Sequence, residues 1–198
     1  MTRTSSLFRV KELVADTAPV ISAAVAEDGS VQEFLLCKGS AKLQELFPTL
    51  EQNRCLHYVS NGDWSTHELV MHLLELIGPA ELYFTTWSLK EYPVRLFLEA
   101  MESGKITQLY ALLDSRVKVR NPDVFQLAKH NFSKVRQYDC HAKVSVLIND
   151  KWVVSIVGSA NMTNNPRVEA CMLSTNQEVG HFHKNWILEL INNGHPLD

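Results

Sequence analysis

The chain has 198 residues and a net charge of −3, with 45% hydrophobic and 21% charged residues, proportions typical of one soluble globular domain rather than of a disordered or fibrous protein. No apolar run approaches the ~20 residues that cross a bilayer, and residues 1–14 lack the apolar core of a secretion signal, so we expect a cytoplasmic protein without stable membrane association. The four cysteines are scattered without a C-x-x-C pair, which argues against a zinc ribbon or a disulfide framework.

Residues 1–54 are predicted to form a small N-terminal extension consisting of a hairpin and a short helix. Two apolar-rich runs flank the segment Glu27-Asp28-Gly29-Ser30, which is typical of a hairpin turn. Ser40 is a candidate cap for a short helix that stops at Pro48. No pattern of catalytic residues stands out here. The extension could pair with a sheet edge, contact a partner or cover part of the core.

From residue 55 onward, short apolar runs alternate with amphipathic helical patterns. Ser65–Glu68 and Ser88–Glu91 have the spacing of capping boxes that begin helices, and Asn121-Pro122 begins a third helix. The main runs predicted as strands are residues 55–59, 80–87, 106–113, 135–139 and 168–174. Such alternation is typical of an α/β fold. We therefore predict that residues 55–198 form one domain, with a mixed, largely parallel sheet sandwiched between helices.

Positive charge is concentrated in the second half of the chain. Residues 1–100 hold 8 Lys and Arg against 13 Asp and Glu, whereas residues 101–198 hold 11 against 9. Between residues 116 and 136 the acidic side chain of Asp123 stands alone among six basic ones. A local positive field of this kind suits a polyanionic substrate, although a solvated charged face accounts for it equally well. The candidate substrate-binding residues are Arg116, Lys118, Arg120, Lys134 and Arg136.

The most distinctive pattern spans residues 141–161. His141 and Lys143 are two apart at the start of an apolar run, so in a strand both side chains leave the same face. A second apolar run, residues 152–157, follows the turn-like segment Asn149-Asp150-Lys151 and opens into Gly158-Ser159-Ala160-Asn161. A hairpin would bring these polar side chains to one end of a sheet. An imidazole, a fixed cation and neutral hydrogen-bond donors are suited to handling a phosphate oxyanion.

This pattern, His141-x-Lys143 followed by a hydrophobic hairpin and Gly158-Ser159-x-Asn161, resembles the signature of the phospholipase D superfamily, the H-x-K…G-S-x-N phosphodiesterases. Members of that family often carry an acidic residue shortly after G-S-x-N, and Glu169 matches it. The sequence departs from the pattern at Ile148, where the family usually has Asp, and the nearest acid is Asp150.

The resemblance implies hydrolysis of a phosphodiester through a phosphohistidine intermediate, without a metal or an organic cofactor. His141 would attack phosphorus, and a second histidine would protonate the leaving group and then activate water. Lys143 and Asn161 would hold the non-bridging oxygens, with support from Ser159. Glu169 would orient an imidazole and stabilise its charged form.

The chain contains a single H-x-K and a single G-S-x-N, although the mechanism needs two histidines at one phosphorus. The resemblance extends to small bacterial endonucleases that act as homodimers, so we expect a homodimer with one shared active site. The basic segment favours nucleic acid, and DNA in particular, as the substrate. Two alternatives stay open: hydrolysis or transfer of a phospholipid, and a domain that has lost catalysis and only docks nucleic acid.

Rival sites are weaker. Glu178, His181 and His183 have a spacing that resembles a metal site, but His181 and His183 diverge on a helix, so we expect no metal there. Cys140 and His141 are neighbours on a strand and would point to opposite faces, which argues against a thiol–imidazole pair. Trp87 ends a predicted strand and is interpreted as a core residue rather than as part of a cleft.

Overall fold

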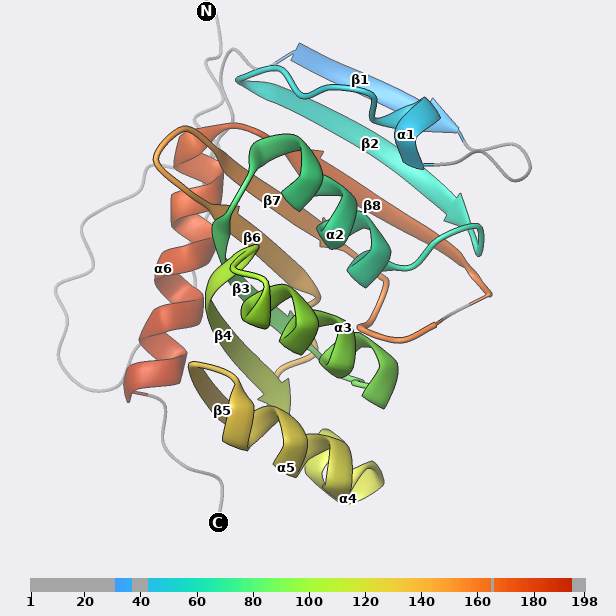
Figure 1. The fold of residues 1–198 in the computed structure, drawn as a ribbon. Coiled ribbons are helices and arrows are strands. Elements are labelled where there is room, and N and C mark those ends of the chain that lie inside the picture. Colours follow the sequence, from blue (N-terminus) through green and yellow to red (C-terminus); the bar gives the residue numbers. More distant parts are fainter. Residues whose placement is uncertain (1–30, 37–42, 165, 194–198) are drawn as a thin grey trace, which may run out of the picture.

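The computed structural model describes residues 31–36, 43–164 and 166–193. These residues form an eight-stranded mixed sheet in the order β1-β2-β8-β7-β6-β3-β4-β5 (Figure 1). The strands are β1 Val31–Leu36, β2 Arg54–Asn61, β3 Ala80–Thr86, β4 Ile106–Asp114, β5 Lys134–Tyr138, β6 Val144–Ile148, β7 Val153–Gly158 and β8 Val168–Ser174. The mixed α/β fold predicted from the alternation of elements is confirmed.

The prediction that the sheet is largely parallel is wrong. Three pairings in the described sheet are parallel, namely β1–β2, β3–β4 and β4–β5, and the other four are antiparallel. The reason lies in the C-terminal third of the chain, because β6, β7 and β8 enter the sheet between β2 and β3 and run antiparallel to their neighbours (Figure 1). A strand–helix–strand pattern constrains the direction of β2 and β3 but not whether they are neighbours.

Helices cover both faces of the sheet, as predicted for the sandwich (Figure 1). The helices are α1 Leu43–Leu46, α2 Thr66–Ile77, α3 Glu91–Glu102, α4 Ser115–Arg120, α5 Pro122–Asn131 and α6 Gln177–Asn193. The larger core cluster packs α2, α3 and α5 on one face, with Leu73, Phe97 and Phe125 among its buried side chains. The smaller cluster packs Ile187 and Ile191 of α6 on the other face. Both layers therefore bury an apolar helix stripe against the sheet.

The described part of the N-terminal extension is continuous with this sheet. Strand β1 pairs in parallel with β2 at the edge of the sheet, and Phe47 is fully buried with its ring edge-on to Tyr58. Helix α1 ends at Leu46, before Pro48. The predicted turn at Glu27–Ser30 and the predicted cap Ser40 lie outside the described residues. The division of the chain at residue 54 stays a prediction.

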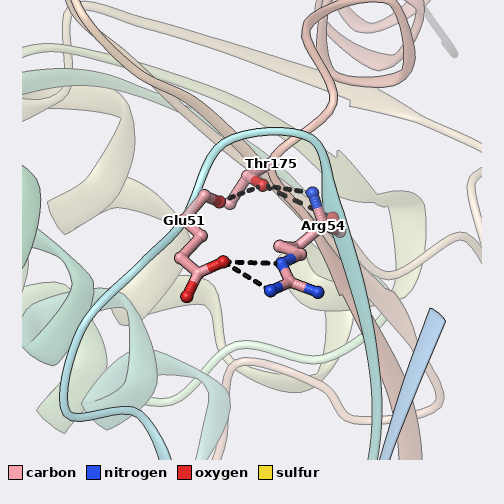
Figure 2. A network of polar contacts seen from close by, with 3 residues as sticks. All are labelled: Glu51, Arg54 and Thr175. Atoms are coloured by element: carbon pink, nitrogen blue, oxygen red, sulfur yellow. Dashed lines mark hydrogen bonds and ion pairs between the residues drawn. The ribbon is translucent and has the colours of Figure 1, made fainter. Parts of the chain in front are cut away.

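A polar network fixes the register of β8 against β2 at the end of the sheet where β8 finishes (Figure 2). The buried hydroxyl of Thr175 accepts from Arg54 N at 2.8 Å and donates to Glu51 O at 2.7 Å. The guanidinium of Arg54 donates to the carboxylate of Glu51 at 2.9 Å. Because a shift of one residue would move every side chain of a strand to the other face, this register decides which face carries Glu169 at the start of β8.

Strands β7 and β8 approach each other closely at Gly158. A Cβ at this position would lie 2.2 Å from Cys171 Sγ and 2.9 Å from Ala170 O, so only glycine fits. The close approach lets Ser159 N donate to Ala170 O at 3.2 Å, which continues the ladder beyond the last residue of β7. Glycine in the G-S-x-N segment is therefore explained by packing.

We expect Gly158→Ala to lower the free energy of unfolding by about 1–3 kcal/mol, because the added methyl overpacks a site without space. Urea denaturation of the purified variant measures this loss. Adding Cys171→Ala removes the Sγ atom and should restore part of the lost stability, since the contact with Ala170 O persists. A Gly158→Ala variant as stable as the wild type would show that the two strands can separate at no cost.

Candidate active site

The two halves of the sequence motif meet at one end of the sheet. The C-terminal ends of β3, β4 and β7 lie there together with the start of β6, because Val144 pairs with both Val157 and Thr85. We call this the motif end. A surface pocket of about 370 Å³ opens there, and its lining includes His141, Lys143 and Ser159. The structure thus brings together residues from both sides of the β6–β7 hairpin.

His141 and Lys143 lie on the same side of the chain, as predicted, but just before the first residue of β6 rather than within it. The ammonium Nζ of Lys143 lies 3.2 Å from His141 Nδ1 and donates to His141 O at 2.6 Å. His141 is exposed and Lys143 is half-buried. Burial lowers the pKa of Lys143, and the nearby acidic groups of Cys140, Glu169 and Asp114 partly oppose this shift. An ammonium that has lost part of its hydration is well placed to bind an anion.

Ser159 links the loop after β7 to Glu169 of β8. Its hydroxyl donates to a carboxylate oxygen of Glu169 and accepts from Ala170 N at 3.1 Å. Glu169 therefore orients Ser159 in this structure, and its negative charge also reaches Lys143. The role of Glu169 as the partner of an imidazole stays a prediction.

Asn161 lies beside Thr86, a fully buried residue at the end of β3 that sequence reasoning did not select. The hydroxyl of Thr86 accepts from Met162 N at 3.1 Å, donates to Ser88 O at 2.8 Å and lies 3.3 Å from Asn161 Oδ1. With its oxygen turned towards Thr86, the amide group of Asn161 has its Nδ2 donors available for other acceptors.

The segment that carries His141 is held by two further buried residues. Thr85 donates to Ala142 O at 2.9 Å and accepts from Val144 N at 3.1 Å. Asp114, at the end of β4, accepts from Cys140 N at 3.2 Å and from Arg116 N at 3.0 Å. One signal could have identified these residues, because polar side chains that end apolar strands often surround a site in α/β proteins.

The interpretation of Trp87 as a core residue is wrong. Its side chain is half-buried at the motif end, and its ring lies 5.6 Å from the imidazole of His141. The guanidinium carbons of Arg116 and Arg120 lie 5.5 and 4.4 Å from the centre of the indole. Two of the predicted substrate-binding residues are thus brought next to the motif, because α4 directly follows β4.

The other basic candidates are placed differently. Lys118 is exposed on α4. Lys134 begins β5 at the opposite end of the sheet and donates to Asn192 of α6 at 2.6 Å, and Arg136 is half-buried in the middle of β5. Asp150 is exposed in the turn between β6 and β7, also at the end opposite His141. The structure does not bring Lys134 or Asp150 to the motif end.

The rival metal pattern lies on α6, where His183 accepts from Trp186 Nε1 at 3.1 Å. Burial lowers the pKa of His183. Within the described ranges, no group of three His, Cys, Asp or Glu side chains is arranged to hold a metal ion. In the same part of the chain, no helix combines the length and apolarity needed to cross a bilayer.

No protein-family model matches the chain, and no curated protein matches it at a significant score. Solved structures do align with it. A polyphosphate kinase from Porphyromonas gingivalis aligns over 73% of this chain and 26% of the kinase, with 14% identity and a TM-score of 0.51. TrmBL2, an archaeal chromatin protein with a novel mode of DNA binding, aligns over 71% of this chain and 55% of its own, with 14% identity and a TM-score of 0.47. The chain therefore spans about a quarter of the kinase and about half of TrmBL2, and the similarity to the kinase shows a shared fold.

Proposed function

We propose that the chain is a phosphodiesterase of the phospholipase D superfamily. It hydrolyses a phosphodiester bond of nucleic acid without a metal ion, and DNA is the favoured substrate. One observation carries the proposal: the ammonium of Lys143 lies 3.2 Å from the imidazole of His141, and both line one pocket with Ser159 from the loop after β7. An imidazole and a partly desolvated cation at one exposed pocket match the chemistry of phosphoryl transfer. The fold is compatible with this chemistry, since a polyphosphate kinase has a similar fold.

In the proposed reaction, a ring nitrogen of His141 attacks phosphorus and the bond to the leaving oxygen breaks. A second imidazole gives its proton to that oxygen, which departs as an alcohol. The same imidazole then removes a proton from water, which attacks phosphorus and breaks the phosphorus–nitrogen bond. Lys143 and Asn161 hold the non-bridging oxygens through both steps, and Ser159 and Glu169 keep the loop in place.

The second imidazole comes from a second copy of the chain. Among the residues that line the pocket, His141 is the only histidine. A twofold axis at the motif end would set two copies of His141 on opposite sides of one phosphate. The large apolar side chains that are exposed in the described residues support this placement, because Tyr92 (54%), Val119 (80%) and Val168 (65%) all belong to segments at the motif end. Burial of such side chains stabilises a dimer.

A domain that docks nucleic acid without cleaving it is favoured by one observation. The acid that the family usually carries after the lysine is replaced by Ile148, and Asp150 lies at the opposite end of the hairpin. Turnover of bis(4-nitrophenyl) phosphate separates the two functions, since only an enzyme releases nitrophenol.

Hydrolysis should survive excess EDTA, because Lys143, Asn161 and two imidazoles supply the charge that a divalent ion would otherwise supply. The measurement uses labelled single-stranded and double-stranded DNA, RNA and phospholipid vesicles, each with and without the chelator. Complete loss of cleavage on chelation, restored by Mg²⁺ or Zn²⁺, would contradict the mechanism. Cleavage of the vesicles alone would identify a phospholipid substrate instead.

His141→Ala should abolish turnover and leave the thermal unfolding midpoint almost unchanged, because the imidazole is exposed. Lys143→Ala should lower kcat by a factor on the order of 10²–10³, the usual effect of removing one group that stabilises an oxyanion. Asp150→Asn is the matched control, since it removes a charge from the other end of the same hairpin. A Lys143→Ala variant with wild-type kcat would rule out the phosphate-binding role of this lysine.

Mixing wild-type subunits with an excess of His141→Ala subunits tests the shared site. After subunit exchange, activity should fall as the square of the wild-type fraction, because a mixed dimer contains one of the two histidines. The dimer interface should bury roughly 1,200–2,000 Å² in total. A linear fall in activity, or a fully active monomer by analytical ultracentrifugation, would show that each chain works alone.

A further inference from the structure

Two arginines and a tryptophan form a cluster beside the pocket that the proposed mechanism does not use. We call Trp87, Arg116 and Arg120 the arginine–tryptophan cluster. The two guanidinium carbons lie 5.5 and 4.4 Å from the centre of the indole, which is the geometry of cation–π contacts. The two arginines are exposed, and the indole ring lies 5.6 Å from His141. The guanidinium carbon of Arg120 is therefore within about 10 Å of the catalytic imidazole.

The cluster gathers positive charge without neutralising it. Neither guanidinium takes part in the ion pairs found among the described residues. The nearby carboxylate of Asp114 is buried and accepts from the backbone N–H groups of Arg116 and Cys140. Two like charges next to one ring repel each other. A bound anion would offset this repulsion and accept charge-assisted hydrogen bonds from both guanidinium groups.

A second observation concerns the indole itself. The Nε1 donor of Trp87 is buried and has no hydrogen-bond acceptor in the part of the chain that the structure describes. An unmade hydrogen bond of this kind costs free energy, and structures usually provide an acceptor. Because Nε1 is shielded from solvent, a bound phosphate does not reach it, and the cost is that of an indole held in this position, where it carries the two guanidinium groups.

We propose that the arginine–tryptophan cluster is a second phosphate subsite, which binds a phosphate flanking the one at His141 in a nucleic-acid strand. The subsite rests on the proposed function for the position of the scissile phosphate. It selects a polymer with successive phosphates, because a substrate with a single phosphodiester cannot occupy both positions. Trp87 is a positioning residue that holds the two guanidinium groups in place, and the arginines contact the strand.

Binding of a fluorescein-labelled oligothymidylate, measured by fluorescence anisotropy, tests the subsite. The measurement uses the His141→Ala protein, so that the strand stays intact. Adding Arg116→Gln and Arg120→Gln should weaken binding on the order of tenfold or more, because charge-assisted hydrogen bonds to phosphate are lost. The slope of log affinity against log salt should fall by on the order of 1. Lys118→Gln is the control for each arginine substitution made alone, since it removes one positive charge from an exposed position on the same helix. It should weaken binding much less than either Arg116→Gln or Arg120→Gln.

Trp87 is tested by a pair of substitutions in the same background. Trp87→Leu should weaken binding of the strand, because the guanidinium groups lose their aromatic support, and Trp87→Phe should restore most of it. Equal affinities for the arginine variant and its parent would overturn the proposal, as would an equal loss with Lys118→Gln. Absence of binding to the strand together with binding to phosphatidylglycerol vesicles that depends on both arginines would assign the cluster to a membrane surface.

Kinetics distinguish failure of the subsite from failure of the proposed function. The dinucleotide TpT has one phosphodiester, and TpTpT adds a flanking one. In the protein with His141 intact, the two arginine substitutions should lower the ratio of kcat/KM for TpTpT to that for TpT by several-fold. If neither substrate nor bis(4-nitrophenyl) phosphate is cleaved, the proposed function fails, and the anisotropy measurement still decides the subsite. An unchanged ratio in an active enzyme would refute the subsite alone.

Discussion

Two adjacent threonines at the end of β3 hold both halves of the motif. The hydroxyl of Thr85 bonds to the backbone at residues 142 and 144, and that of Thr86 bonds to the backbone of residues 88 and 162 and lies beside Asn161. Successive residues of a strand point to opposite faces, so one strand can hold two separate segments. Both threonines are buried, where hydrogen bonds are strong and their loss is costly. The position of His141 relative to Asn161 depends on these bonds.

Around this support, the motif end gathers three cations, and its two carboxylates accept hydrogen bonds from backbone and hydroxyl groups. Lys143 is half-buried and lies next to His141. On its other side His141 lies next to Trp87 of the arginine–tryptophan cluster. Asp114 is bound to backbone N–H groups and Glu169 to Ser159. These two carboxylates orient backbone and hydroxyl groups, and the three cations Lys143, Arg116 and Arg120 can attract a polyanion to the same end of the sheet. The overall charge of −3 conceals this arrangement, because it averages over the whole surface.

The topology of the sheet explains why residues from distant segments meet at this end. Parallel strands β3 and β4 finish at the same end of the sheet, so the residues that follow them, Trp87 and α4, become neighbours. Strand β6 runs antiparallel to β3 and therefore starts at that end, directly after His141. In α/β sheets, ligands usually bind at the C-terminal ends of the parallel strands. Here the open end of the β6–β7 hairpin lies at that same end of the sheet.

The sequence by itself determined the hairpin and the approach of His141, Lys143 and Ser159, because alternation along a strand and the length of a turn are local properties. It also indicated the mixed α/β fold and the basic residues of α4. Only the tertiary structure decided the order and direction of the strands, since pairing depends on contacts between distant segments. For the same reason Trp87 lies at the motif end and not in the predicted core, and Lys134 lies at the opposite end of the sheet. The position of a residue within a strand is a local property, but the end of the sheet at which it lies depends on how the strands pair.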